Sequence, residues 1–230
     1  AVQGGEAETA FEWKGGSFGS YQLSPNGKTI AFSGTEEDPA LERNRRAKTD
    51  FKVIDEWRPA GLYVVDLNTK AIRKLYAGEH VGSFDWAPDG SRIAFDRRPN
   101  PDLDLLRKVD IAEVAVETGA VTPIATTAAT ESQPKYSPDG RYLAFTRSAV
   151  PAGSQSPVKI VLLSRRDGAV RELLATRDES PVLVDWMPDS SGILYTEPRG
   201  TRNALSVMPI DGPSRDLLAG PGVRQSVKLN

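Results

Sequence analysis

One short phrase occurs four times along this 230-residue chain. In each copy an apolar or aromatic residue stands two positions before a proline, Asp-Gly or a close variant follows the proline, and an aromatic ring stands seven positions after it. The prolines are residues 25, 88, 138 and 188, and the rings are Phe32, Phe95, Phe145 and Tyr195. Self-similarity at intervals of 50 to 63 residues indicates a repeat protein, in which each repeat is one unit of the fold.

The phrase has the chemistry of a hairpin turn between two strands. Proline presets its own backbone angle, aspartate can bond the backbone of the turn, and glycine accepts the left-handed conformation. Strand patterns stand on both sides, such as 84–86 before the turn and 92–95 after it. A third strand, a second turn and a fourth strand follow in every unit, for example 111–116, 118–119 and 121–124. Four strands in roughly 40 to 50 residues match one β-propeller blade.

The sequence therefore predicts an all-β fold, a β-propeller with four four-stranded blades and the first strand of a fifth. The whole chain, 1–230, is expected to form one partial propeller domain. Its blades are predicted at about 17–76, 80–125, 130–175 and 180–219, with an extra strand at 223–230.

The end of the chain leaves two interpretations of the propeller open. Residues Val227 to Asn230 resemble the start of a fifth phrase, which favours a propeller interrupted at this point. A closed four-bladed ring, whose last strand completes another blade, is the alternative. An interrupted propeller exposes strand edges, so we expect it to pair with missing blades or with a second copy of the chain.

The first unit is longer than the others because of an insertion at 34–59. Asp38 is a good N-cap and Pro39 suits a first helical turn, so a short helix is predicted there. Basic and acidic residues balance in the insertion, which excludes a nucleic-acid-binding patch. They are Arg43, Arg45, Arg46 and Lys48 against Glu36, Glu37, Asp38 and Glu42. We interpret the segment as a surface helix, with a docking or substrate-gating element as the alternative.

Composition excludes several partners and cofactors. The net charge of −2 gives no reason to expect nucleic acid or an anionic membrane, and no apolar run is long enough to span a bilayer. With no cysteine and one histidine, the usual zinc sites are excluded, and neither a calcium loop nor a phosphate loop occurs. No cofactor or metal is predicted. The chain begins at Ala1, which fits a cytoplasmic protein or a mature periplasmic or secreted one.

One motif imitates a catalytic site. Residues Gly15 to Gly19 match the G-x-S-x-G elbow of serine hydrolases, which functions only on a strand-to-helix turn. Ser17 leads into a repeat strand instead, and it stands eight residues before its proline, as His80 does before the next. Thr130 and Ser180 hold the same place. The four residues therefore mark one repeated inter-blade loop position, and no catalytic residue is predicted.

The remaining recurrent residues have structural interpretations. Asp89, Asp139 and Asp189 are explained by their turns rather than by metal binding. Trp86 and Trp186 occupy equivalent repeat positions, which favours a place in the core between blades over a ligand platform.

The Pro-Asp-Gly hairpins and their Ile/Leu-Ala-Phe strands resemble the repeats of TolB-like proteins and of the propeller of prolyl oligopeptidase-family serine peptidases. The first unit is more similar to the acylaminoacyl-peptidase branch. The segments that carry this resemblance are EEDP at 36–39, KTDFKVIDE at 48–56 and GLYVVDL at 61–67. The resemblance covers most of the chain.

The resemblance implies a propeller of seven or eight blades over an α/β-hydrolase domain that holds a Ser-Asp-His triad. In such proteins the propeller restricts access to the active site, so that short peptides enter and folded proteins are excluded. This chain is similar to the first half of the propeller, and no stretch resembles the hydrolase domain. The implied function is a gating and positioning fragment of a peptidase for short or acylated peptides, with the missing blades, the hydrolase domain and the peptide as partners. A TolB-like protein-binding propeller without enzymatic activity is the alternative, and an enzyme with its site on the propeller is a third possibility.

Overall fold

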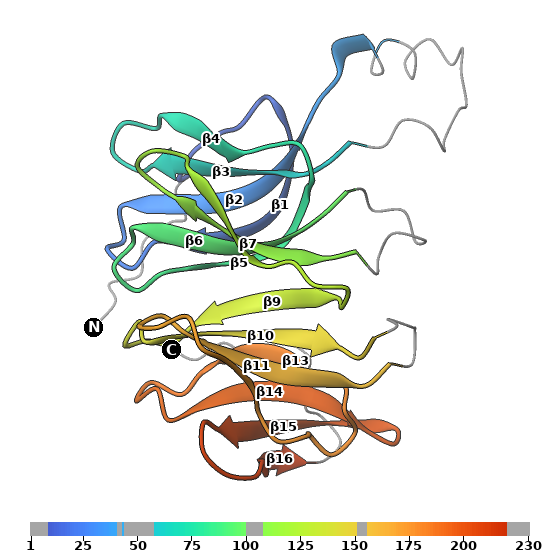
Figure 1. Ribbon diagram of the computed structural model, residues 1–230. Helices are drawn as coiled ribbons and strands as arrows, with labels where there is room; N and C mark the ends of the chain where they lie inside the picture. The colour runs from blue at the N-terminus through green and yellow to red at the C-terminus, as the bar shows by residue number, and fades with distance from the viewer. Residues whose placement is uncertain (1–8, 41–42, 44–57, 100–107, 151–155, 220–230) are drawn as a thin grey trace.

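The computed structural model describes residues 9–40, 43, 58–99, 108–150 and 156–219. Its sixteen strands form four antiparallel sheets of four, each built from consecutive strands (Figure 1). Blade 1 contains β1 (Gly16–Leu23), β2 (Thr29–Glu36), β3 (Gly61–Asp66) and β4 (Ile72–Tyr76), and blade 2 contains β5 (His80–Trp86), β6 (Arg92–Arg98), β7 (Asp110–Ala115) and β8 (Val121–Ala125). Blade 3 contains β9 (Glu131–Tyr136), β10 (Tyr142–Ser148), β11 (Val158–Ser164) and β12 (Val170–Glu172), and blade 4 contains β13 (Val182–Trp186), β14 (Gly192–Arg199), β15 (Arg202–Pro209) and β16 (Arg215–Ala219).

This arrangement confirms the predicted all-β fold with four four-stranded blades. The predicted extra strand at 223–230 lies outside the described residues, as does most of the predicted helical insertion. Of the insertion, residues 34–36 belong to β2, because Gly34 to Glu36 continue the pairing with β1. Pro39, Ala40 and Arg43 are helical, and the Asp38 carboxylate accepts the Ala40 N–H at 2.7 Å, as expected for an N-cap.

The predicted hairpin turns form at all four copies of the phrase. Gly27, Gly90 and Gly140 have φ values of 69°, 72° and 69° at the left-handed position of the turn. The fourth copy has Ser190 there, at a φ of 59°. Its buried hydroxyl accepts the Asp139 N–H of the preceding blade at 3.2 Å, so the serine joins two turns as well as closing its own.

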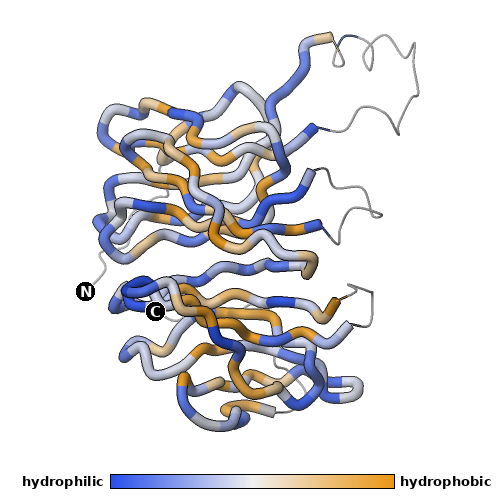
Figure 2. The backbone as a smooth tube through the Cα atoms, viewed as in Figure 1, coloured by the Kyte–Doolittle hydropathy of each residue, from blue (hydrophilic) through white to orange (hydrophobic). Residues whose placement is uncertain are grey.

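The hydrophobic core lies between successive blades. At the first interface the small and aliphatic side chains of blade 1, Ala31, Leu62 and Val64, pack against Phe84 and Trp86 of blade 2. At the next two interfaces Tyr136 and Trp186 take the place of Trp86, and each again packs against an alanine and aliphatic side chains of the preceding blade. Figure 2 shows apolar residues concentrated along the strands and hydrophilic ones at the turns. Each blade therefore covers the apolar face of its neighbour, and a single blade would bury little apolar surface by itself.

The two repeat tryptophans confirm the predicted core position. Trp86 is 6% exposed and Trp186 is 1% exposed. The indole N–H of Trp86 donates to the Gln22 carbonyl of blade 1 at 3.3 Å, and that of Trp186 donates to the Lys135 carbonyl of blade 3 at 3.0 Å. Each tryptophan thus holds the first strand of its blade against the preceding blade through packing and one hydrogen bond.

In every blade the connection between the second and third strands begins and ends on the same side of the molecule. The strand ends from which they leave point to the right in Figure 1. In blades 1 to 3 these connections span 37–60, 99–109 and 149–157, whereas in blade 4 only Gly200 and Thr201 separate β14 from β15. We call this side the loop edge.

Candidate functional site

The four residues at the predicted common position do lie at equivalent places. Ser17 is the second residue of β1 and faces Thr35 across the sheet, and His80 begins β5. Thr130 and Ser180 directly or closely precede the first strands of blades 3 and 4. The expectation of a loop position needs correction for Ser17 and His80, because extended pairing includes both in strands.

The serine-hydrolase motif has no elbow geometry. Gly16 to Gly19 form part of β1, which leads through a turn into β2 and not into a helix. A nucleophile elbow needs the helix to supply exposure and oxyanion donors. Ser17 therefore lies within a strand and not on the strand-to-helix turn that a nucleophile elbow requires.

His80 has a structural contact on the loop edge. Its Nδ1 accepts the Ala60 N–H at 3.2 Å, which connects the start of blade 2 to the residue before β3. Burial lowers the pKa of His80, and the positive charge of Arg98 lowers it further. The imidazole is therefore neutral at pH 7 and accepts a hydrogen bond.

The His80 ring should titrate with a midpoint below its ordinary value of 6.5. Because the pKa is lower in the folded state, the unfolded chain binds the proton more readily. The stability contributed by neutral His80 is present above pH 6.5 and is lost as the pH falls through the folded pKa. NMR titration measures this directly, since the chain has one histidine, and His80→Gln is the non-titrating control. A midpoint at or above 6.5 would contradict the lowered pKa and the neutral state of His80.

Two aspartates of blade 2, the buried Asp96 and the partly buried Asp85, have raised pKa values for structural reasons. Burial raises the pKa of both Asp85 and Asp96. Asp85 accepts the Tyr136 N–H at 2.8 Å, and Asp96 accepts the Gln133 N–H at 3.1 Å. Both carboxylates therefore hold the first strand of blade 3 against blade 2, and these contacts account for their burial.

Arginine–glutamate pairs fasten the loop edge of blades 2 and 3. Arg97 near the end of β6 lies 2.7 Å from Glu79, which precedes β5. Arg147 near the end of β10 lies 3.1 Å from Glu131, whose side chain is fully buried. In each blade the guanidinium thus connects the end of the second strand to a glutamate at, or directly before, the start of the first strand.

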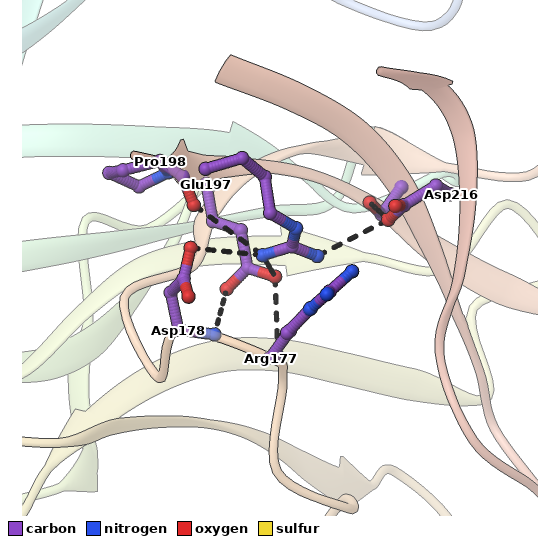
Figure 3. Close-up of polar contacts among 7 residues, drawn as sticks. Arg177, Asp178, Glu197, Pro198 and Asp216 are labelled. Carbon is purple, nitrogen blue, oxygen red and sulfur yellow. Dashed lines mark hydrogen bonds and ion pairs between the residues drawn. The ribbon is translucent and has the colours of Figure 1, made fainter. Parts of the chain in front are cut away.

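Blade 4 reverses the charge at this position. Glu197 stands where Arg97 and Arg147 stand, nine residues after the repeat proline, and its side chain is fully buried. It accepts the backbone N–H groups of Arg177 and Asp178 at 3.3 and 3.2 Å (Figure 3). The Glu197 carboxylate thus also connects the second strand of its blade to the segment before the first strand, but it does so through backbone N–H donors.

Arg199 supplies the balancing charge. Its guanidinium contacts Glu197 and lies 3.2 Å from both Asp178 and Asp216, so three carboxylates converge on one cation (Figure 3). Burial opposes the charge, but hydrogen bonds from Arg199 to Glu197 and Asp178 raise its pKa. A hydrogen bond from Ser206, at 2.7 Å, and one from Arg199 lower the pKa of Asp216. Arg199 and Asp216 are therefore both charged at neutral pH.

A cavity of about 430 Å³ opens above this cluster. Its lining includes the exposed residues Arg177 and Arg202, whose side chains have no hydrogen bond or ion pair within the described part of the chain. Guanidinium groups bind carboxylates and phosphates through paired N–H donors. The pocket, defined by Arg177, Arg199, Arg202, Asp178 and Asp216, is therefore a candidate binding site for a carboxylate-bearing ligand.

A further buried acidic residue distinguishes the interface of blades 2 and 3. Glu113 is 2% exposed. It accepts a hydrogen bond from the Tyr136 hydroxyl and pairs with Arg92 at 3.4 Å and Arg165 at 2.9 Å. Burial, and then the charge of Glu113, raise the pKa of Tyr136, which keeps its proton. The equivalent positions of the other blades are apolar: Val64, Leu162 and Val207.

The charged residues of these two clusters were not predicted as site residues. Their detectable signal is a break in the repeat: Glu113 replaces an aliphatic residue, and Glu197 replaces an arginine. No group of three or more histidine, cysteine or acidic residues suited to a metal ion occurs among the described residues. In the same part of the chain, no helix has the length and apolar character to cross a bilayer.

The four successive antiparallel blades define the chain as a portion of a β-propeller. No protein-family model and no curated protein matches the sequence. Among solved structures, TolB from Acinetobacter baumannii is similar with a TM-score of 0.58 and 22% identity, over 89% of this chain and 43% of TolB. Acylaminoacyl peptidase from Pyrococcus horikoshii is similar with a TM-score of 0.59 and 13% identity, over 89% and 32% of the two chains.

The β-propeller domain of the Trilobed protease from Pyrococcus furiosus is similar with a TM-score of 0.59 and 15% identity, over 89% and 58% of the two chains. The chain thus spans less than two thirds of each of these three structures. At these identities the likeness shows the fold: a partial propeller of the kind found in TolB and in these peptidases.

Proposed function

We propose that this chain is a propeller portion of a serine peptidase of the prolyl oligopeptidase type, which gates and positions short or acylated peptides. Bond cleavage belongs to an α/β-hydrolase domain outside these 230 residues. The observation that carries the proposal is the similarity of four consecutive blades to the acylaminoacyl peptidase and to the Trilobed protease propeller. The described residues themselves offer no nucleophile elbow, as the strand position of Ser17 shows.

The arginine-lined pocket fits a positioning role within this proposal. A short peptide carries a carboxylate, and Arg177 and Arg202 have donors free to bind one. Arg199 cannot serve in this way because it is committed to three acidic partners. The pocket is expected to contribute to substrate affinity and not to the chemical step.

A serine-reactive fluorophosphonate probe tests the proposal. The longer polypeptide encoded by the same gene should be labelled and should cleave acylated short peptides, whereas the 230-residue chain should show neither property. Ser17→Ala in the longer polypeptide is the matched control and should leave both unchanged. A longer polypeptide without labelling or turnover would favour the TolB-like binding propeller and would overturn the proposal.

A further inference from the structure

The face of blade 1 that points away from blade 2 is apolar and uncovered. Tyr21 pairs with Phe32 across the sheet as Phe84 pairs with Phe95, and Leu23 pairs with Ile30 as Trp86 pairs with Ile93. Phe84 and Trp86 are each 6% exposed because blade 1 covers them. Tyr21 and Leu23 are 71% and 54% exposed. Blade 1 thus carries the same interface positions without a preceding blade.

The chain itself covers one part of this face. Phe11 and Trp13 precede the first repeat, and each lies 5.3 to 5.4 Å from Phe18 and Phe32, measured between ring centroids. Trp13 also lies 5.1 Å from Tyr63. These two rings cover Phe32 and Tyr63, which lie on β2 and β3, the middle strands of blade 1 itself. The part formed by the first strand stays open.

The open part forms an apolar groove of about 340 Å³. It is lined by Ala10, Phe11, Phe18, Gly19, Tyr21 and Ile30. Isolated exposed apolar residues are common, but a contiguous patch at the edge of a repeat array indicates an interaction surface. We call the surface of Phe18, Tyr21, Leu23 and Ile30 the blade 1 face.

The three blade interfaces show what fits such a face. At the first interface Phe84 and Trp86 are covered by Ala31, Leu62 and Val64, a small residue on the second strand and two aliphatic residues on the third. The corresponding residues of blade 4, Leu194, Leu205 and Val207, are already buried. A second copy of the chain therefore has no open blade of this kind within the described residues.

We propose that the blade 1 face docks a further four-stranded blade of the same repeat type, supplied by polypeptide outside these 230 residues. The incoming blade presents small and aliphatic side chains to Tyr21 and Leu23, as blade 1 does to Phe84 and Trp86. The inference rests on the proposed function only for the existence of a longer propeller; it does not require peptidase activity.

Single-cysteine labelling tests this docking, because the chain has no cysteine of its own. Leu23→Cys should react rapidly with a maleimide in the 230-residue chain. In a longer, otherwise cysteine-free polypeptide from the same gene, labelling should slow about tenfold, in line with the exposures of 54% for Leu23 and 6% for Trp86. Val170→Cys, at 48% exposure on β12 of blade 3, is the control and should react equally in both proteins.

Three outcomes overturn the inference. Equal labelling of Leu23→Cys in both proteins would show that nothing docks on the face. Labelling of the 230-residue chain that slows as its concentration rises would assign the face to a second copy. A reading frame that adds no further blade would remove the occupant. A longer polypeptide that protects position 23 from maleimide and yet does not react with fluorophosphonate would support the docking and contradict only the peptidase function.

Discussion

Replacing Trp186 by alanine is expected to lower the free energy of unfolding by about 3–5 kcal/mol, the range for aromatic residues removed from a core. Trp186 is 1% exposed and packs with Ile193 and Tyr195. Its indole also donates to the Lys135 carbonyl. The substitution therefore leaves a cavity between blades 3 and 4 and an unpaired carbonyl. Urea unfolding followed by circular dichroism measures the loss.

The repeat supplies a matched control for this prediction. Leu23 holds the same place in blade 1 and is 54% exposed, so Leu23→Ala should change stability by only about 0.5 kcal/mol. Trp186→Phe keeps most of the ring but loses the N–H donor, and it should fall between the two. Equal losses for Trp186→Ala and Leu23→Ala would contradict the assignment of the core.

Removing the Arg199 side chain is expected to destabilise blade 4 by about 3–5 kcal/mol, as for a buried ion pair deprived of one partner. Glu197 is fully buried, and Arg199, 15% exposed, is the cation that contacts it. Arg199→Ala leaves that carboxylate without a compensating charge and removes the cation that Asp178 and Asp216 each contact. Urea unfolding at pH 7 again provides the measurement.

Arg171→Ala is the control for charge removal at the surface. Arg171 pairs with Asp211, and the two side chains are 47% and 85% exposed, so the loss should be below about 1 kcal/mol. In Arg199→Ala combined with Glu197→Gln the buried charge is absent, and part of the stability should return. A cost for Arg199→Ala no greater than that for Arg171→Ala would show that the cluster contributes nothing.

The hairpins could be predicted from sequence because their determinants are local. In Pro138-Asp139-Gly140, proline, aspartate and glycine each act within the turn itself, and the Asp139 carboxylate accepts the Arg141 N–H at 3.0 Å. The spacing of the aromatic ring then placed the second strand, and the recurrence of four strands placed the blade. These features depend on neighbours only a few residues away.

The charged clusters depend on partners far along the chain. Glu113 meets Tyr136 and Arg165, which stand 23 and 52 residues later, and Arg199 meets Asp178 and Asp216. Only the register of the strands and the order of the blades bring these side chains together. Phe11 and Trp13 lie before the first repeat, so no periodic pattern could place them on Phe32.

The two-residue connection of blade 4 makes loop length the quantity that controls access to the arginine-lined pocket. Gly200 and Thr201 join β14 to β15 at the loop edge, and Gly200 itself lines the cavity. A connection as long as residues 149–157 in blade 3, inserted between Arg199 and Arg202, would stand beside that opening. Selectivity at this site could therefore change by insertion alone, while every blade and every buried ion pair stays in place.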